Sequence, residues 1–115
     1  MNSLIEQIFD NFIINKTVIP VHFLHYEGHE ETYVLYQMTD ADTEFSADDN
    51  LINYVEYYDF DVYSKGNYLP IIEALKAKLK QHDFIFQPSR SSGDMFETDT
   101  GYYHRTLCFA YIREE

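Results

Sequence analysis

The 115-residue sequence contains no tryptophan, one cysteine, three prolines and four glycines. The single Cys108 excludes an intramolecular disulfide and a metal site built from cysteines alone, and it fits a reducing compartment. Runs of about 18 apolar residues are missing, so no membrane-spanning segment is predicted. Glu6 and Asp10 stand where a secretory signal would carry basic residues. We therefore expect a soluble protein made in the cytoplasm.

Aromatic residues are abundant in spite of the missing tryptophan, with eleven Tyr and nine Phe. Hydrophobic residues make up 45% of the chain, which predicts a folded globule, and the length predicts one domain over residues 1–115. Tyr and Phe favour strands, and a half-buried Tyr can keep its hydroxyl in water. Aromatic residues are also enriched at interfaces. The composition therefore indicates an open sheet face, or a subunit that buries tyrosines against its neighbours.

Basic residues are few and unevenly distributed. Residues 1–64 hold 13 acidic residues and one basic residue, Lys16, which gives a net charge of −12, whereas residues 65–115 hold seven of each sign. An acidic half repels phosphate backbones, so direct binding to nucleic acid is not expected. Two interpretations stay open. The acidic half is either a solubilising surface or an edge of one subunit that meets the lysines of another.

The pattern of the chain predicts an α+β fold in the order α-β-β-β-α-β-β. We expect a mostly antiparallel sheet of four to five strands, because the strands follow one another rather than alternating with helices, and two helices packed on one of its faces. The first helix is predicted over 3–14, opened by a capping box of Ser3 and Glu6. Strands over 17–26 and 32–39 are expected to pair as a hairpin.

The central part of the chain carries the clearest pattern. Residues 51–64 alternate with period 2, so we predict a strand with a core face of Tyr54, Tyr58, Phe60 and Val62. A helix is predicted over 68–81, with Pro70 in its first turn. Its predicted buried stripe consists of Leu69, Ile72, Leu75 and Leu79, with Ile71 at the margin.

The remaining segments are predicted to be two polar loops and two strands. Residues 40–50 and 89–100 have neither helical nor strand periodicity and are interpreted as solvated loops. Residues 84–88 are predicted to form a short strand, and residues 101–113 alternate throughout and predict the closing strand.

Potential metal ligands occur in three groups, and each has a simpler interpretation. Residues 40–44 (DADTE) begin like a calcium loop, but Phe45 and Leu51 occupy the positions that need Gly and Glu. His22, His25 and His29 are spaced like zinc ligands. Residues three apart on a strand face opposite sides, however, so His22 and His25 cannot both bind one zinc ion, and polar residues on a partly exposed hairpin are the simpler interpretation.

Asp59, Asp61 and Lys65 make the third group, which would suit a metal-dependent nuclease. An exposed acidic strand face is the simpler interpretation of the two carboxylates.

The sequence contains no recognisable nucleophile or phosphate-binding motif. Cys108 lies inside a predicted strand and is interpreted as a small buried hydrophobic residue. The serines have no G-x-S-x-G context, and neither a Walker nor a G-x-G-x-x-G pattern is present. We expect a protein that is not an enzyme and that needs neither a cofactor nor a metal.

Three parts of the chain together resemble the tail-completion proteins of long-tailed bacteriophages, also called tail-terminator or head-to-tail joining proteins. They are the short N-terminal helix before a hairpin, the segment YYDFDVYSKGNYLPIIEALKAKL at 57–79, and the closing strand TGYYHRTLCFAYIR at 100–113. The DVYSK segment at 61–65, followed by a helix, is the part most similar to the family. The resemblance covers nearly the whole chain in size and element order.

The resemblance implies a small α+β subunit that assembles into a ring, commonly a hexamer. Such a ring caps the tail tube and joins it to the head connector, so the implied location is the virion tail, with assembly in the host cytoplasm. Neither a membrane nor nucleic acid is an expected partner. The residues predicted to contact other subunits or partner proteins are Tyr57, Asp59, Asp61, Tyr63, Lys76, Lys78, Lys80, Asp40, Asp42, Glu44 and Arg90.

Two alternatives to a ring subunit stay open. The acidic first half would also suit a monomeric binding module or inhibitor that mimics nucleic acid. The third hypothesis is the metal-dependent enzyme that would use Asp59 and Asp61.

Overall fold

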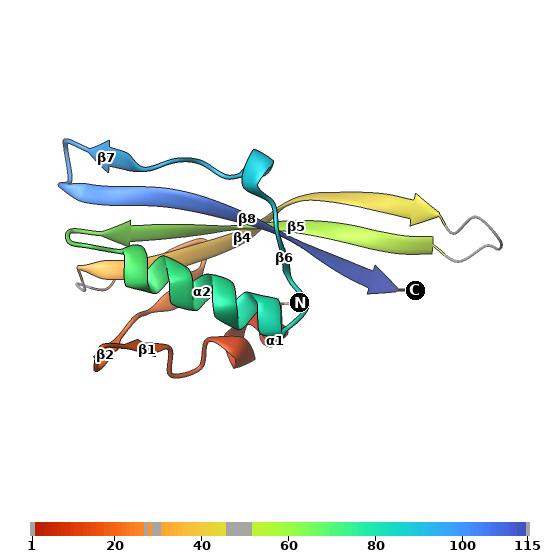
Figure 1. The fold of residues 1–115 in the computed structure, drawn as a ribbon, viewed down its shortest axis with the longest axis horizontal. Helices are drawn as coiled ribbons and strands as arrows, with labels where there is room; N and C mark the ends of the chain where they lie inside the picture. The colour runs from red at the N-terminus through yellow and green to blue at the C-terminus, as the bar shows by residue number, and fades with distance from the viewer. Residues whose placement is uncertain (1, 27, 29–30, 46–51, 115) are drawn as a thin grey trace.

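The structure is a computed structural model, and it describes residues 2–26, 28, 31–45 and 52–114. The described residues form two α-helices, α1 (Asn2–Ile8) and α2 (Leu69–Gln81), a short 3-10 helix, η1 (Pro88–Arg90), and eight strands (Figure 1). The strands are β1 (Ile13–Ile14), β2 (Thr17–Val18), β3 (Val21–Phe23), β4 (Thr32–Phe45), β5 (Ile52–Ser64), β6 (Ile85–Phe86), β7 (Met95–Glu97) and β8 (Tyr102–Glu114).

A mixed, mostly antiparallel sheet is the frame of the molecule. Its described strands have the order β3-β4-β5-β8-β6, and β7 also pairs with β8. The three long strands β4, β5 and β8 run side by side along the longest dimension of 51 Å and extend past both helices (Figure 1). The fold is therefore α+β, as predicted, but the described sheet has six strands instead of four to five, and β1 and β2 form a separate two-stranded ribbon.

The predicted hairpin of residues 17–26 and 32–39 is wrong. β3 runs parallel to β4, with Val21 opposite Val34 and Phe23 opposite Tyr36. Backbone hydrogen bonds bracket this short ladder, since Val34 N–H donates to the Pro20 carbonyl at 2.8 Å and Leu24 N–H donates to the Tyr36 carbonyl at 3.0 Å. An alternating pattern specifies which residues face the core but not the direction of the neighbouring strand, so the sequence could not distinguish the two pairings.

The first helix is shorter than predicted, because α1 ends at Ile8 and not at residue 14. Asn11, Asn15 and Lys16 adopt positive φ angles of 57°, 51° and 68°, a conformation that no α-helix accommodates. Ser3 lies inside the helix, so the predicted capping box is also wrong. Phe9 and Phe12 nevertheless reach the core. The helical spacing identified the buried side chains and not their secondary structure.

Both predicted loops contain strand. The described part of the first, residues 40–45, continues β4 and pairs with residues 52–57 of β5 beyond a β-bulge between Met38 and Asp40. Residues 46–50 of that predicted loop lie outside the described residues. Residues 89–100 contain the end of η1 and strand β7, which pairs with β8. Polar strands beyond the helices need no apolar face, and so they lack the period by which strands are recognised.

Helix α2 agrees with its prediction in extent and nearly so in its buried face. Pro70 lies in the first turn, and Ile71, Ile72, Leu75 and Leu79 are buried. Leu69, in contrast, is 52% exposed, so the predicted stripe is wrong at this position. The N–H of Leu69 donates to the Asn67 side chain at 3.2 Å, which satisfies one of the backbone donors that a helix start leaves unpaired.

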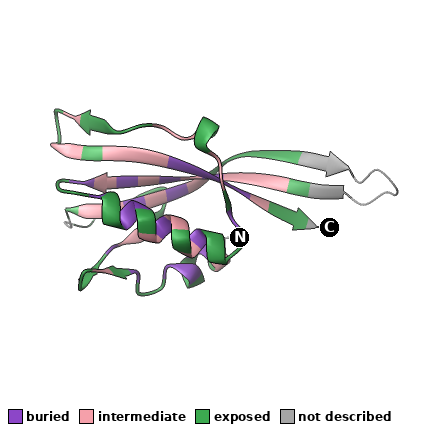
Figure 2. Cartoon of the chain, viewed as in Figure 1, coloured by how far each residue is buried: buried purple, intermediate pink, exposed green. Residues whose placement is uncertain are grey.

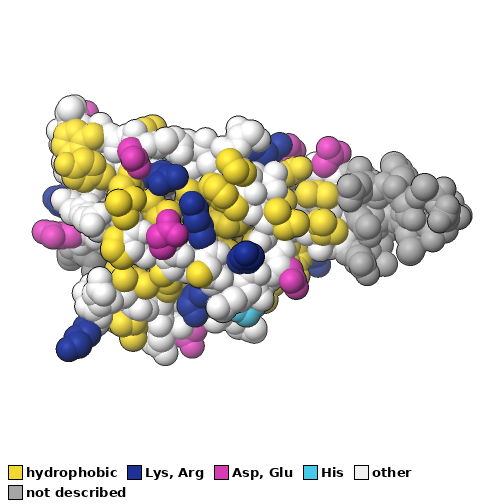
Figure 3. Space-filling view, viewed as in Figure 1, with side chains coloured by type: hydrophobic (Ala, Val, Ile, Leu, Met, Phe, Trp, Pro, Cys, Tyr) yellow, Lys and Arg dark blue, Asp and Glu magenta, His cyan; other side chains and the backbone are white. Residues whose placement is uncertain are grey.

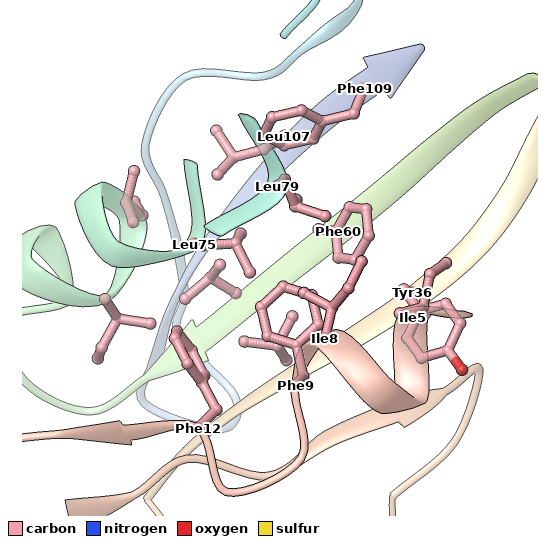
Figure 4. Packing of buried hydrophobic residues seen from close by; sticks show 14 of the residues in the cluster. Ile5, Ile8, Phe9, Phe12, Tyr36, Phe60, Leu75, Leu79, Leu107 and Phe109 are labelled. Carbon is pink, nitrogen blue, oxygen red and sulfur yellow. The ribbon is translucent and has the colours of Figure 1, made fainter. Parts of the chain in front are cut away.

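One apolar cluster joins both helices to the same face of the sheet (Figure 4). The Phe60 ring on β5 lies 6.0 Å from Phe9, 5.8 Å from Tyr36 and 5.7 Å from Phe109. The predicted core residues Tyr58 and Val62 are buried beside it. Buried residues gather beneath the helices, and the strands beyond them are half-buried or exposed (Figure 2).

The predicted core residue Tyr54 belongs to the part of β5 beyond the helices and is 38% exposed. The prediction that Tyr54 is a core residue is therefore wrong, because alternation along a strand does not show where the helices stop covering the sheet. No described helix is long and apolar enough to cross a membrane.

Leu75 and Leu69 offer a matched test of which face of α2 is buried. Leu75 is fully buried and Leu69 is half exposed, so we expect Leu75→Ala to lower the free energy of unfolding by about 2–5 kcal/mol. Leu69→Ala should lower it by less than about 1 kcal/mol. Urea denaturation followed by circular dichroism measures both values. Equal losses would contradict the orientation of the helix.

Candidate interaction surfaces

The strand residues predicted as contacts lie on the sheet face turned away from the helices. Tyr57, Asp59, Asp61 and Tyr63 alternate on β5 with the core residues and are all half-buried. Each of them contacts a side chain from a neighbouring strand or from η1. Instead of the exposed acidic face that the sequence predicts, these residues form a polar and aromatic network within the subunit.

Arg90 links three segments across this face. Its guanidinium carbon lies 3.8 Å from the centre of the Tyr57 ring, and its Nη2 donates to Asp40 Oδ2 at 3.1 Å. Stacking of a guanidinium on an aromatic ring combines with the ion pair to hold the side chain in place. Three residues predicted separately as contacts, Asp40, Tyr57 and Arg90, are therefore brought together.

Asp59 lies opposite Cys108 in the register of β5 and β8. Burial raises the pKa of Asp59, and a hydrogen bond from the Cys108 thiol partly offsets this effect. The pKa of the Cys108 thiol is also raised. Burial is the largest cause, and the negative charge of Asp59 is the second. Cys108 is buried, as predicted, and its raised pKa opposes formation of a reactive thiolate.

Asp61 is held by two residues of β8. Its Oδ1 accepts a hydrogen bond from the Thr106 hydroxyl at 2.5 Å and lies 3.2 Å from His104 Nε2. The His104 ring stacks on Tyr63 at 4.2 Å, and Tyr63 stacks on Tyr33 of β4 at 4.9 Å. The pKa of Tyr63 is raised to about 12, mainly because the hydroxyl is buried and secondly because of the negative charge of Asp61.

The potential metal ligands of the sequence do not gather in the described residues. Lys65 lies over the Tyr102 ring at 5.0 Å, whereas Asp61 contacts Thr106 and His104. His22 stacks on Tyr26 at 4.8 Å, and His29 lies outside the described residues. Over the described part of the chain, no group of three or more His, Cys, Asp or Glu side chains is arranged to hold a metal ion.

Two serines protect the outer edge of β8, a role that the sequence did not reveal. β6 pairs with β8 at Phe109 and Ala110, and β7 pairs with it at residues 102–104. Between them, the N–H groups of Thr106 and Cys108 donate to the hydroxyls of Ser92 and Ser91, both at 2.9 Å. The carbonyls of the same two β8 residues accept from the backbone N–H groups of Ser92 and Gln87, so side-chain hydroxyls and irregular backbone together pair this part of the strand edge.

A hollow of about 390 Å³ lies where α2 meets β6 and β8, at one edge of the sheet. We call it the lysine-rimmed hollow, lined by Lys76, Lys80, Phe84, Ile85, Phe86 and Phe109. Lys76 Nζ lies 4.5 Å from the centre of the Phe86 ring, and Ile85 is 49% exposed. Basic side chains lie among hydrophobic ones on this side of the molecule (Figure 3). Lys78, the third predicted contact of the helix, does not line the hollow.

A second hollow, of about 620 Å³, lies at the opposite edge, where β3 ends beside β4. We call it the β4-edge groove, lined by Ser3, Phe23, Leu24, Gln37, Met38, Glu56 and Tyr58. Phe23, Leu24 and Met38 are each about half exposed. Glu56 is the charged residue among the described residues of this lining. Its carboxylate accepts a hydrogen bond from the Tyr58 hydroxyl at 3.3 Å.

The remaining predicted contacts lie on β4, beyond the bulge. Asp42 is exposed on this strand, and the side chain of Glu44 lies outside the part that the structure describes. A further group of exposed apolar residues surrounds the start of α2 and β7, where the rings of Phe96 and Tyr103 lie 4.9 Å apart. Sequence alternation did not single out this group.

Comparison of the chain with models of known protein families finds no match, and comparison with curated protein sequences finds none either.

Asp59→Asn tests the half-buried carboxylate through the pH dependence of stability. Because the pKa of Asp59 is raised in the folded chain, stability falls as the pH rises from the unfolded value of about 3.9 through the folded pKa. The neutral amide avoids this loss. We therefore expect the free energy of unfolding of the variant, minus that of the wild type, to increase through this window and then level off.

Urea denaturation at several pH values measures this difference. Asp99→Asn, at an exposed position, is the matched control for the change in net charge. A difference that stays constant or falls with rising pH would contradict burial as the main influence on the pKa of Asp59. The Cys108 thiol and Arg90, which lower this pKa, would then outweigh burial.

Proposed function

We propose that this protein is a structural assembly subunit that associates head to tail with further copies of itself to form a ring. The resemblance to tail-completion proteins implies where such a ring would act, capping a phage tail tube and joining it to the head connector. Under this proposal the subunit has no catalytic role.

The observation that carries the proposal is the difference between the two edges of the sheet. The lysine-rimmed hollow lies at the β6–β8 edge and the β4-edge groove at the β3–β4 edge. Both hollows expose large apolar side chains, Ile85 in the first and Phe23, Leu24 and Met38 in the second, and Lys76 and Lys80 rim the first. Exposed apolar surface of this kind marks sites of association between proteins.

Contacts between different surfaces of identical subunits are heterologous, and they close into rings when the rotation between subunits allows it. The two hollows expose different side chains, so a contact of one hollow with the other would join different surfaces of two copies. The elongated sheet holds them in a fixed relation, because β4, β5 and β8 are paired along most of their length.

The alternative of an acidic inhibitor has less support from the geometry. A mimic of nucleic acid needs carboxylates that point outward in regular order. Asp40 pairs with Arg90, Asp61 contacts His104, and Glu56 lies 3.6 Å from Arg113. These acidic side chains are therefore occupied within the subunit.

Charge reversal on α2 tests the proposal. Lys76→Glu combined with Lys80→Glu replaces the positive rim of the hollow with negative charge, in a chain whose net charge is already −12. We expect the concentration needed for assembly to rise about 100-fold or more, because like charges at an interface cost several kcal/mol. Light scattering coupled to size-exclusion chromatography measures the native mass against the 13.7 kDa of one chain.

The matched control is Lys78→Glu, on the same helix but outside the hollow, which we expect to leave assembly unchanged. Thermal unfolding of all three proteins shows whether the fold is retained. A wild-type protein that stays monomeric at high concentration, alone and with tail-tube or connector proteins, would overturn the proposal.

A further inference from the structure

The outer edge of β4 is open along the part of the sheet that extends past the helices (Figure 1). β3 ends at Phe23, opposite Tyr36, whereas β4 continues to Phe45. Among the described residues, no strand pairs with this side of β4 after Tyr36. A bare strand edge presents a row of backbone N–H and C=O groups with which a strand of another molecule can pair, and natural proteins block such edges.

The backbone N–H of Ala41 points toward this open edge. Residue pairs in an antiparallel ladder alternate between bonded and unbonded pairs. Cys108 on β8 directs its backbone away from β5, because its N–H donates to Ser91 and its carbonyl accepts from Gln87. Counting from Cys108 along the ladder of β5 and β8, the backbone groups of Glu56 point to β8. Ala41 lies opposite Glu56, so its own N–H is directed away from β5.

Asp40 covers this N–H with its side chain. Asp40 Oδ1 accepts a hydrogen bond from the Ala41 N–H at 2.9 Å, and Asp40 Oδ2 accepts one from Arg90 Nη2 at 3.1 Å. Arg90 is in turn held over the Tyr57 ring, 3.8 Å from its centre. The carboxylate is therefore bonded at both oxygens, and the Ala41 donor is already used within its own chain.

A β-bulge lies beside the covered donor, between Met38 and Asp40. A bulge interrupts the regular spacing of the ladder and increases the local twist. Bulges and charged side chains are both means by which natural sheets keep their edges from pairing. Asp42 adds a further exposed acidic residue on the same strand. These features occur together at residues 38–42, in the open part of β4.

We propose that Asp40 closes the outer edge of β4 to pairing with strands of other molecules, and that Arg90 is the positioning residue that holds it there. Contacts between copies are thereby limited to surfaces of side chains and do not extend one sheet into the next. This role is independent of the proposed ring, because a monomeric protein with the same open edge would need it as well.

Two substitutions of Asp40 separate the hydrogen bond from the charge. Asp40→Ala and Asp40→Asn each remove one negative charge, but the Asn amide keeps an oxygen that can accept from the Ala41 N–H. The Asp40 side chain is 54% exposed, so both variants are expected to fold. We expect Asp40→Ala to form β-rich aggregates at a protein concentration about 10-fold lower than Asp40→Asn does, because one uncovered donor becomes available to a neighbouring strand. Thioflavin T fluorescence and sedimentation measure this concentration.

Ala41→Pro identifies the edge at which the aggregates form. Proline removes the outward N–H itself and is tolerated on an edge strand whose N–H faces solvent. Added to Asp40→Ala, it should restore the aggregation threshold of the wild type. Arg90→Ala should lower the threshold even though it makes the chain more negative, and it should have no further effect in the Asp40→Ala chain.

Two outcomes would overturn this role of Asp40. Equal thresholds for Asp40→Ala and Asp40→Asn would mean that charge alone protects the edge. Aggregation of Asp40→Ala that Ala41→Pro does not reverse would mean that the chains associate at another place or through unfolding, which thermal unfolding of each variant measures. The native mass of the wild type, which tests the ring, enters neither comparison, so failure of one proposal leaves the other standing.

Discussion

Phe60 stands at the middle of the central strand, and the helices are attached to the sheet around it. Its ring meets aromatic rings from the segment after α1, from β4 and from β8. Such ring pairs contribute roughly 0.5–1.5 kcal/mol each beyond the burial of their area. Because these contacts gather at one place, the helices cover only part of the sheet, and the three long strands continue past them without a second layer (Figure 2).

The opposite face of the sheet is held without helices. Arg90 reaches over Tyr57 to Asp40, Asp61 joins β5 to β8, and Tyr63 stacks between residues of both neighbouring strands. Cross-strand pairs of this kind stabilise a sheet that has one solvated face. Among the described acidic residues of the first half, Asp40, Glu56, Asp59 and Asp61 have partners within the subunit.

The two edges of the sheet differ in how their backbone and apolar side chains are covered, and the proposed association depends on this difference. Ser91 and Ser92 pair with the backbone of β8 on one side, which leaves the apolar hollow below the α2 lysines as the exposed feature there. On the other side β3 is short, and the groove beside β4 stays open. The asymmetry makes a contact between two different surfaces of neighbouring copies possible.

The sequence by itself determined the α+β class, helix α2 with most of its buried face, the burial of Cys108 and the core positions at Tyr58, Phe60 and Val62. These features depend on local spacing and on hydrophobicity, which a single chain displays directly. Only the tertiary structure decided that β3 is parallel to β4, that polar residues continue β4 beyond Met38, and that Asp59 and Asp61 are partnered on β8. Strand direction, register and cross-strand partners join residues far apart in the chain, and alternation carries the same pattern for every such arrangement.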